Sequence, residues 1–246
     1  MSIFEYQILS HRDSIRLIYL LPGAKGDPLC CRVRHVRISE NPSYEALSYT
    51  WGAPALTETI WEKDSGSSIA ITRNLKDALE DLRKRDRPRV LWVDAACIKQ
   101  SDADERGHQV SLMGEVFQNA TKVVVWLGRS TKGNLSSSAE LCALSGVAAR
   151  LDSGMIAKMF NIGSARNPAD SSEVYRVLVF LDRPWFRRVW TVQEFVLAKD
   201  VEMQIGRQTL SLKHFRTTVM WLAKVFQELG PASATRKFLI QFRSHS

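Results

Sequence analysis

The chain has 246 residues, of which 45% are hydrophobic and 24% are charged, the balance of a soluble globular protein that can bury a sizeable core. It contains no uninterrupted apolar run of the roughly 20 residues that a membrane span needs. The first residues, MSIFEYQILSHRD, lack the cationic start and apolar core of a signal peptide. We therefore expect a cytoplasmic protein with no membrane span.

The formal net charge is +8, which favours an anionic partner or substrate. The basic residues form three clusters: Arg32, Arg34 and Arg37; Arg83, Lys84, Arg85, Arg87 and Arg89; and Arg183, Arg187 and Arg188. No zinc-finger or RNA-recognition signature accompanies these clusters. We interpret most of them as solvated faces and do not expect a nucleic-acid partner.

The four cysteines form no CxxC pair and have no histidine at zinc-ligand spacing, so we expect no metal site. Adjacent Cys30 and Cys31 would point to opposite faces of a strand, which suits core filling. Cys97 with His108 as a nucleophilic pair is a minor alternative, because nothing in the local sequence orients the two side chains.

The first third of the chain predicts two hairpins and a strand. Strand-like runs at 15–21 and 29–38 flank the turn PGAKGDP and predict an opening hairpin. Residues 44–50 predict a further strand that stops at Trp51-Gly52. Residues 57–72 alternate around KDSGSS and predict a second hairpin.

Helices and apolar strands then alternate. Asn74 is the expected N-cap of an amphipathic helix over 74–85, and residues 90–93 form a short buried strand that closes on Asp94. A helix follows over 105–120, with Ser101 and Asp104 as its capping signal and with Val110, Met113, Phe117 and Ala120 on one face. The run VVVWL at 123–127 is another buried strand. This order predicts an α/β core with a mostly parallel sheet and crossover helices.

The second half is less regular. Short helical pieces are expected around 139–151 and 155–160, then a final strand at 201–205 and a helix over 210–229. We interpret residues 1–246 as a single domain with four parts: an N-terminal hairpin extension at 1–43, an α/β core at 44–128 and 183–206, an insertion at 129–182, and a C-terminal helical segment at 207–246.

The stretch RPWFRRVWTVQEFVLA at 183–198 carries the candidate catalytic residue. If one helix runs on from Pro184, a stripe of apolar residues includes one carboxylate, and its members are Phe186, Trp190, Glu194, Leu197 and Ala198. A carboxylate in such a row must find a partner, shift its pKa or face a cleft. Two interpretations stay open for Glu194: an ion pair with Arg187 or Arg188, or a functional group.

In an open parallel sheet, ligands bind beyond the carboxyl ends of the strands. The residues expected there are Tyr49, Trp51, Gly52, Asp94, Trp126 and Gly128. Rings, glycines and a carboxylate could bind a flat ligand, and the basic charge favours an anionic nucleotide, although each residue also has a plain structural explanation. No GxGxxG or P-loop motif indicates a dehydrogenase or an NTPase.

Several ordered motifs resemble the heterokaryon-incompatibility (HET) domain of filamentous fungi. They are YEALSYTWG at 44–52, NL at 74–75, LWVDAACIKQ at 91–100, ER at 105–106, QV at 109–110, WLG at 126–128 and RPWFRRVWTVQE at 183–194. The resemblance implies an intracellular domain whose activation triggers programmed cell death after non-self recognition.

The HET pattern is in turn similar to that of Toll/interleukin-receptor (TIR) domains, which have a flavodoxin-like α/β fold. VVVWLG followed by a helix with WTVQEF resembles the third TIR strand and its helix, which implies that Glu194 is the glutamate that cleaves NAD. On this view NAD is a substrate and no cofactor is required, with Trp51 or Trp190 stacking on a ring and Arg188 meeting phosphate. The alternative is a non-catalytic module that self-associates or binds other death-signalling proteins.

Overall fold

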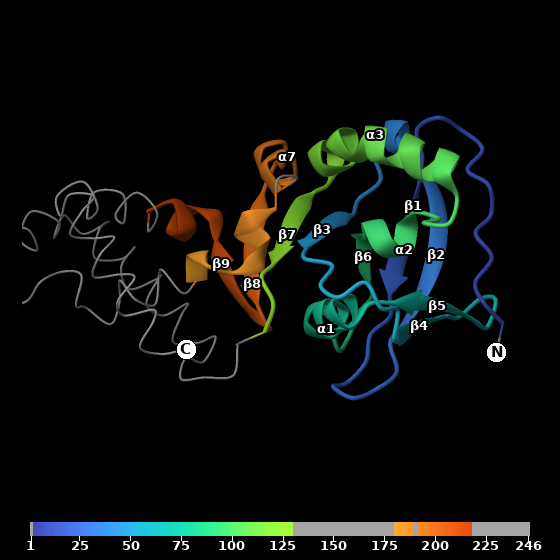
Figure 1. The fold of residues 1–246 in the computed structure, drawn as a ribbon, viewed down its shortest axis with the longest axis horizontal. Coiled ribbons are helices and arrows are strands. Elements are labelled where there is room, and N and C mark those ends of the chain that lie inside the picture. The colour runs from blue at the N-terminus through green and yellow to red at the C-terminus, as the bar shows by residue number, and fades with distance from the viewer. Residues whose placement is uncertain (1, 130–179, 189–190, 218–246) are drawn as a thin grey trace, which may run out of the picture. The chain divides into compact units, whose positions relative to one another are not determined.

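The computed structural model describes residues 2–129, 180–188 and 191–217 (Figure 1). The chain forms two compact units, one of Met1–Arg129 with Pro184–Thr209 and one of Ser130–Arg183 with Leu210–Ser246. Within the described residues, no helix has both the length and the apolar character needed to cross a membrane.

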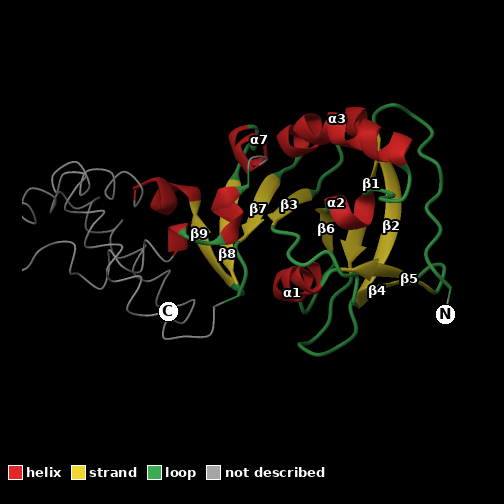
Figure 2. Ribbon diagram, viewed as in Figure 1, coloured by secondary structure: helices red, strands yellow, loops and turns green. Residues whose placement is uncertain are grey.

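The first unit is built on a mixed sheet, whose strand order is β5-β4-β2-β1-β6-β3-β7-β8-β9 (Figure 2). The strands are β1 (Ser14–Leu20), β2 (Cys30–Arg37), β3 (Glu45–Tyr49), β4 (Glu58–Glu62), β5 (Ser67–Ile71), β6 (Arg89–Trp92), β7 (Lys122–Trp126), β8 (Val201–Ile205) and β9 (Gln208–Ser211).

The centre of the sheet is parallel. β3 pairs in parallel with β6 on one side and with β7 on the other, and β7 pairs in parallel with β8. The three valines of β7 are fully buried, as expected of a strand with both faces covered. The prediction that these four strands lie together in one parallel arrangement is confirmed.

The flank of the sheet is largely antiparallel. β1 pairs with β2 and β4 pairs with β5 in the two predicted hairpins, and β1 is also antiparallel to β6. The nearly continuous burial of β1 explains this position, because a strand buried on both faces belongs inside the sheet rather than at its edge. The sheet as a whole is therefore mixed, and the prediction of a mostly parallel sheet is correct only for its centre.

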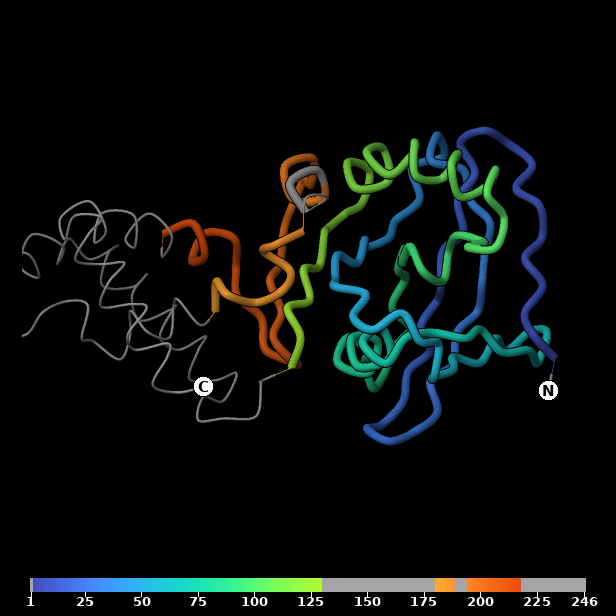
Figure 3. The backbone as a smooth tube through the Cα atoms, viewed as in Figure 1, coloured from blue at the N-terminus to red at the C-terminus, as the bar shows by residue number. Residues whose placement is uncertain are grey.

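Four α-helices and two 3-10 turns accompany the sheet in the described part of the first unit: α1 (Arg73–Leu82), α2 (Asp94–Cys97), α3 (Ala103–Asn119), α7 (Thr191–Val196), and the 3-10 turns Ile38–Glu40 and Pro184–Arg187. The predicted apolar stripe of α1 is buried, namely Leu75, Ala78, Leu79 and Leu82. α3 and α7 lie next to each other, while α1 lies on the other side of the sheet (Figure 1 and Figure 3). The predicted crossover helices are thus present.

The predicted helix caps were wrong. The Thr72 side chain caps α1 by accepting the Leu75 N–H at 3.2 Å, and Asp102 caps α3 by accepting the Glu105 N–H at 3.1 Å. Both residues stand three positions before an otherwise unpaired helical N–H, which is the geometry that a cap requires. The Asn74 amide instead donates to the Thr50 carbonyl.

The inward face of α3 also differs from the prediction. Val110, expected in the core, is 40% exposed, whereas neighbouring Gln109 is fully buried. The Gln109 amide Nε2 donates to the Ser14 carbonyl at 2.9 Å, so the buried donor is satisfied. A polar side chain with a specific partner has therefore replaced the apolar residue that the periodicity favoured.

The stretch at 183–198 is not one helix. Pro184–Arg187 is a 3-10 turn, Arg188 lies outside helical geometry, and α7 begins only at Thr191. Glu194 therefore does not share a helical stripe with Phe186. Trp190 lies outside the described residues, so its predicted ring contact stays a prediction.

The carboxyl-terminal part contains a strand that was not predicted. β8 confirms the strand at 201–205, but β9 follows it, and Leu210 belongs to this strand rather than to a helix. Residues 212–217 are helical. In the second unit, the Phe180 and Phe215 rings lie 6.0 Å apart. The rest of the helix expected to 229 and the helical pieces at 139–151 and 155–160 fall outside the described residues.

Candidate functional site

Glu194 lies in α7, in the connection between β7 and β8, and is 3% exposed. The Ser48 hydroxyl donates a hydrogen bond to Glu194 Oε2, and an Arg188 guanidinium nitrogen lies 3.3 Å from Oε1. Both carboxylate oxygens are therefore engaged. The interpretation that Glu194 pairs with Arg188 is confirmed.

Ser48 is held in turn by Trp185. The indole Nε1–H of Trp185 donates to Ser48 Oγ at 2.7 Å, and both side chains are buried. Because the serine oxygen accepts this hydrogen, its own hydroxyl hydrogen is directed to Glu194. The sequence reasoning missed both residues, although each lies within a motif that carried the family resemblance.

Arg188 links the two sides of this cluster. Its second guanidinium nitrogen donates to the Tyr49 carbonyl, so one side chain joins the end of β3 to Glu194 on α7. The Arg188 side chain is 24% exposed, whereas that of Glu194 is 4% exposed. The arginine is thus the more accessible partner of the pair.

Asp94 follows β6 and is half-buried. Its Oδ2 accepts the Trp51 indole N–H and its Oδ1 accepts the Ala95 N–H, each at 2.7 Å. Its carbonyl accepts the Gln100 amide Nε2 at 2.9 Å, which ties the loop back on itself. Asp94 therefore organises the loop that follows β6.

Asp94 is also electrostatically connected to Glu194. Burial raises the pKa of Asp94 to about 6, opposed by the hydrogen bonds from Trp51 and Ala95. The negative charge of Glu194 raises it further and the positive charge of Arg188 lowers it. Asp94, at the end of the second parallel strand, therefore lies close enough to Glu194 for the charge of Glu194 to raise its pKa.

Tyr49 and Trp51 complete this end of the sheet. The Tyr49 hydroxyl is buried beside Asp94. Burial, reinforced by the charge of Asp94, holds the pKa of Tyr49 well above its usual value. Trp51 is 38% exposed, so its ring is accessible while its indole N–H donates to Asp94.

Gly52 has a backbone reason for its identity. Its φ is +72°, and an added Cβ would come within 3.2 Å of the Asn74 Cβ. A larger residue would therefore be strained as well as crowded. Gly52 lets the chain turn directly after Trp51.

The remaining sequence candidates take structural positions. Trp126 is 2% exposed and its indole N–H donates to Asp81 on α1 at 3.2 Å, so it belongs to the core. Gly128 adopts a left-handed φ of +94°. The Cys97 thiol is buried, which raises its pKa to about 12, and it accepts the Val93 N–H. His108 instead contacts the Arg12 carbonyl at 2.6 Å, so the Cys97–His108 pair was wrong.

This arrangement, which we call the Glu194 site, brings together Ser48, Tyr49, Trp51, Asp94, Trp185, Arg188 and Glu194. It combines two carboxylates, which can stabilise positive charge, with an arginine that can meet an anion and an accessible aromatic ring. Such a set suits a ligand that carries both a developing cation and a phosphate.

Comparisons with known proteins agree on one family. Residues 44–194 match the family model for "Heterokaryon incompatibility protein (HET)". Over 250 aligned residues the chain is 30% identical to Heterokaryon incompatibility protein 6, OR allele, of Neurospora crassa, covering 86% of this chain and 36% of that protein. It is 24% identical over 164 residues to Vegetative incompatibility protein HET-E-1 of Podospora anserina, covering 65% and 10%. No solved structure matches. The chain thus spans about a third or less of these relatives.

Proposed function

The chain belongs to the heterokaryon incompatibility (HET) family, whose members take part in fungal non-self recognition, and we propose that it triggers cell death by cleaving NAD at the nicotinamide–ribose bond. The observation that carries the proposal is the position of Glu194, buried beside Arg188 and electrostatically coupled to Asp94 at one end of the parallel strands. The protein would act in the cytoplasm.

The order of the parallel strands supports a TIR-like fold. Numbered along the chain, β3, β6, β7 and β8 are the first to fourth parallel strands, and they lie in the order 2-1-3-4. This is the beginning of the flavodoxin-like order 2-1-3-4-5, in which ligands bind at the carboxyl ends of the strands where the order reverses. Glu194 lies between the third and fourth strands, as the TIR resemblance requires.

The chemistry needs one well-placed anion. When the bond between ribose C1′ and the pyridinium nitrogen breaks, its electron pair returns to the ring, so nicotinamide leaves neutral and needs no proton. Glu194 would stabilise the cationic ribose in the transition state, as a carboxylate does in glycosidases. Water then bonds to C1′ and loses its proton to solvent, which gives ADP-ribose.

The other residues of the Glu194 site would hold the substrate. Arg188 is the more exposed partner of the ion pair and could exchange Glu194 for a substrate phosphate, which would free Oε1. Trp51 would stack on a ring, with Trp190 as a further candidate. Asp94 and the Tyr49 hydroxyl beside it would meet polar groups of the substrate near the turn at Gly52.

The second candidate function is a non-catalytic module that self-associates or binds other death-signalling proteins. The observation that favours it is the closed state of Glu194, whose two oxygens are engaged by Ser48 and Arg188. In this case the ion pair stabilises the junction between β3 and α7 and has no substrate to meet.

Incubation of the purified chain with NAD distinguishes the two functions. Chromatography would follow nicotinamide and ADP-ribose at several protein concentrations and after mild chemical cross-linking, because assembly can complete a site. Equimolar release of both products supports NAD cleavage. Association detected by analytical ultracentrifugation without any release in the associated state would favour the signalling module.

A further inference from the structure

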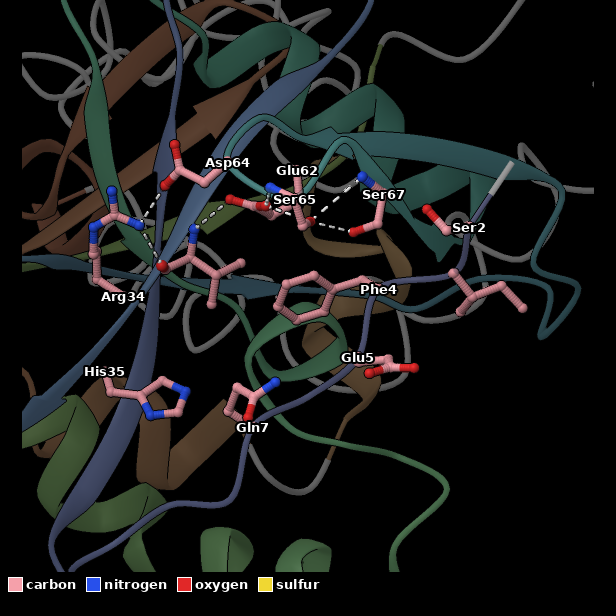
Figure 4. A pocket seen from close by; sticks show the side chains of 12 residues that line it. Ser2, Phe4, Glu5, Gln7, Arg34, His35, Glu62, Asp64, Ser65 and Ser67 are labelled. Atoms are coloured by element: carbon pink, nitrogen blue, oxygen red, sulfur yellow. Dashed lines mark hydrogen bonds and ion pairs between the residues drawn. The ribbon is translucent and has the colours of Figure 1, made fainter.

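A cavity lies in the same unit, away from the residues of the Glu194 site. It has a volume of about 530 Å³, within the range of small-molecule sites. One wall is the N-terminal segment Ser2–Gln7, and the other consists of β2 and the turn between β4 and β5 (Figure 4). None of the motifs that identify the family contributes a side chain to it.

The cavity contains a buried carboxylate, Glu62, at the end of β4. Glu62 is 3% exposed, and its Oε2 accepts the Ser65 N–H at 2.7 Å and the Ser65 hydroxyl at 2.6 Å. Its Oε1 accepts the Val33 N–H at a long 3.4 Å, and the backbone N–H of Asp64 also bonds to this carboxylate. One oxygen of a buried carboxylate therefore has capacity to accept a further hydrogen.

Glu62 is charged, and no ion pair engages it among the residues that the structure describes. Burial alone would raise its pKa, but the hydrogen bonds from Ser65 and neighbouring N–H groups prevail and lower it, so the carboxylate is ionised at neutral pH. Within the described part of the chain, no arginine, lysine or histidine pairs with it. Arg34 lines the cavity but pairs with Asp64 at 2.7 Å, as Arg32 does at 3.2 Å, so the charge of Arg34 is partly neutralised by this carboxylate.

The other walls suit the carbon skeleton of a cation. Phe4 lines the cavity with its ring held edge-on against Tyr6, at 4.9 Å between centroids. An aromatic face attracts ammonium and guanidinium groups and also covers an aliphatic stem. Desolvation and the nearby Arg16 lower the pKa of His35, so this lining residue is neutral at pH 7 and does not repel a cation.

We propose that this cavity binds a small organic cation whose ammonium or guanidinium group pairs with Glu62 and whose carbon stem lies against Phe4. The whole chain carries a net charge of +8, which disfavours loose association of cations with its surface. Binding of a cation therefore requires a local site such as this one. The cavity would let the concentration of a cellular amine influence the stability of the N-terminal segment.

Isothermal titration calorimetry with agmatine, which carries an amine and a guanidinium, tests the proposal on the full chain. We expect saturable binding with one site per chain. Glu62→Gln keeps the shape and the bonds from Ser65 but removes the charge, so it should weaken binding at least about tenfold. Phe4→Leu should weaken it about threefold. The matched control Glu58→Gln changes the other end of β4, outside the cavity, and should leave binding unchanged.

A second measurement locates the ligand without altering Glu62. A photoreactive alkylamine should label peptides from Ser2–Gln7 or from the β4–β5 turn, and agmatine should compete with the labelling. Absence of saturable binding, equal affinity in Glu62→Gln and the wild type, or labelling elsewhere in the chain would overturn the proposal. Because no step involves NAD, these results are independent of those for the Glu194 site.

Discussion

The ion pair between Arg188 and Glu194 should be asymmetric when its partners are removed singly. Arg188→Gln leaves a carboxylate that is 4% exposed and retains the Ser48 hydroxyl as its recorded donor. Glu194→Gln leaves a guanidinium that is 24% exposed and still donates to the Tyr49 carbonyl. Leaving the buried Glu194 carboxylate without its partner should therefore cost more free energy of unfolding than leaving the partly solvated Arg188 guanidinium without its partner.

The magnitudes follow from these exposures. Breaking a buried pair costs about 3–5 kcal/mol, and partial solvation of Arg188 reduces this to about 2–4 kcal/mol for Arg188→Gln. For Glu194→Gln we expect about 1–2 kcal/mol, because water can solvate the remaining arginine. A double-mutant cycle should give a coupling free energy of roughly 1–3 kcal/mol.

Urea unfolding monitored by tryptophan fluorescence would measure these free energies. The control cycle is the pair of Arg73 and Asp77 on α1, 3.4 Å apart, in which the arginine side chain is 65% exposed. Its coupling should not exceed about 0.5 kcal/mol. A smaller loss for Arg188→Gln than for Glu194→Gln, or equal coupling in the two cycles, would refute the reasoning.

The Asp94 carboxyl should titrate near pH 6. Because the folded chain binds the carboxyl proton more tightly than the unfolded chain does, the contribution of Asp94 to the free energy of unfolding should fall as the pH rises from 3.8 to about 6. Carbon NMR of the labelled carboxyl would measure this pKa, and Glu194→Gln should lower it because the negative charge beside Asp94 is removed. An unchanged pKa would contradict the electrostatic interaction between Asp94 and Glu194. Glu105→Gln should cost about 3 kcal/mol in urea unfolding, because it leaves the fully buried Arg16 guanidinium without its anion, and a cost below 1 kcal/mol would contradict this. Leu79→Ala should cost about 2–5 kcal/mol by the same assay, since this side chain of α1 is fully buried, and a neutral result would contradict the packing of α1.

Much of the sheet could be predicted because its signals are local. The buried run of β7 and the alternation around the turn between β4 and β5 depend only on neighbours in the sequence. The sequence therefore predicted both the strand β7 and the hairpin of β4 and β5. How β1 would join β6 could not be predicted, because pairing between strands distant in the chain leaves no periodic signal.

The candidate site shows the same division. Tyr49, Trp51 and Asp94 could be identified because strand ends predict which residues converge. Ser48 and Trp185 could not, since an inward-facing serine on a strand looks like any small core residue until its partner is known. The break at Arg188 was missed because residues 185–198 contain no glycine or proline that would mark the end of a helix.

The most direct test of the account is the rate of nicotinamide release from NAD per folded molecule of Glu194→Gln, compared with the wild type and with Glu115→Gln on the exposed side of α3. Glutamine keeps the size of the side chain but lacks the charge that a cationic transition state needs, so the account predicts a loss of about a hundredfold or more with the fold intact and with Glu115→Gln unchanged. Unchanged release by folded Glu194→Gln, or no release by the wild type in any state of assembly, would contradict it.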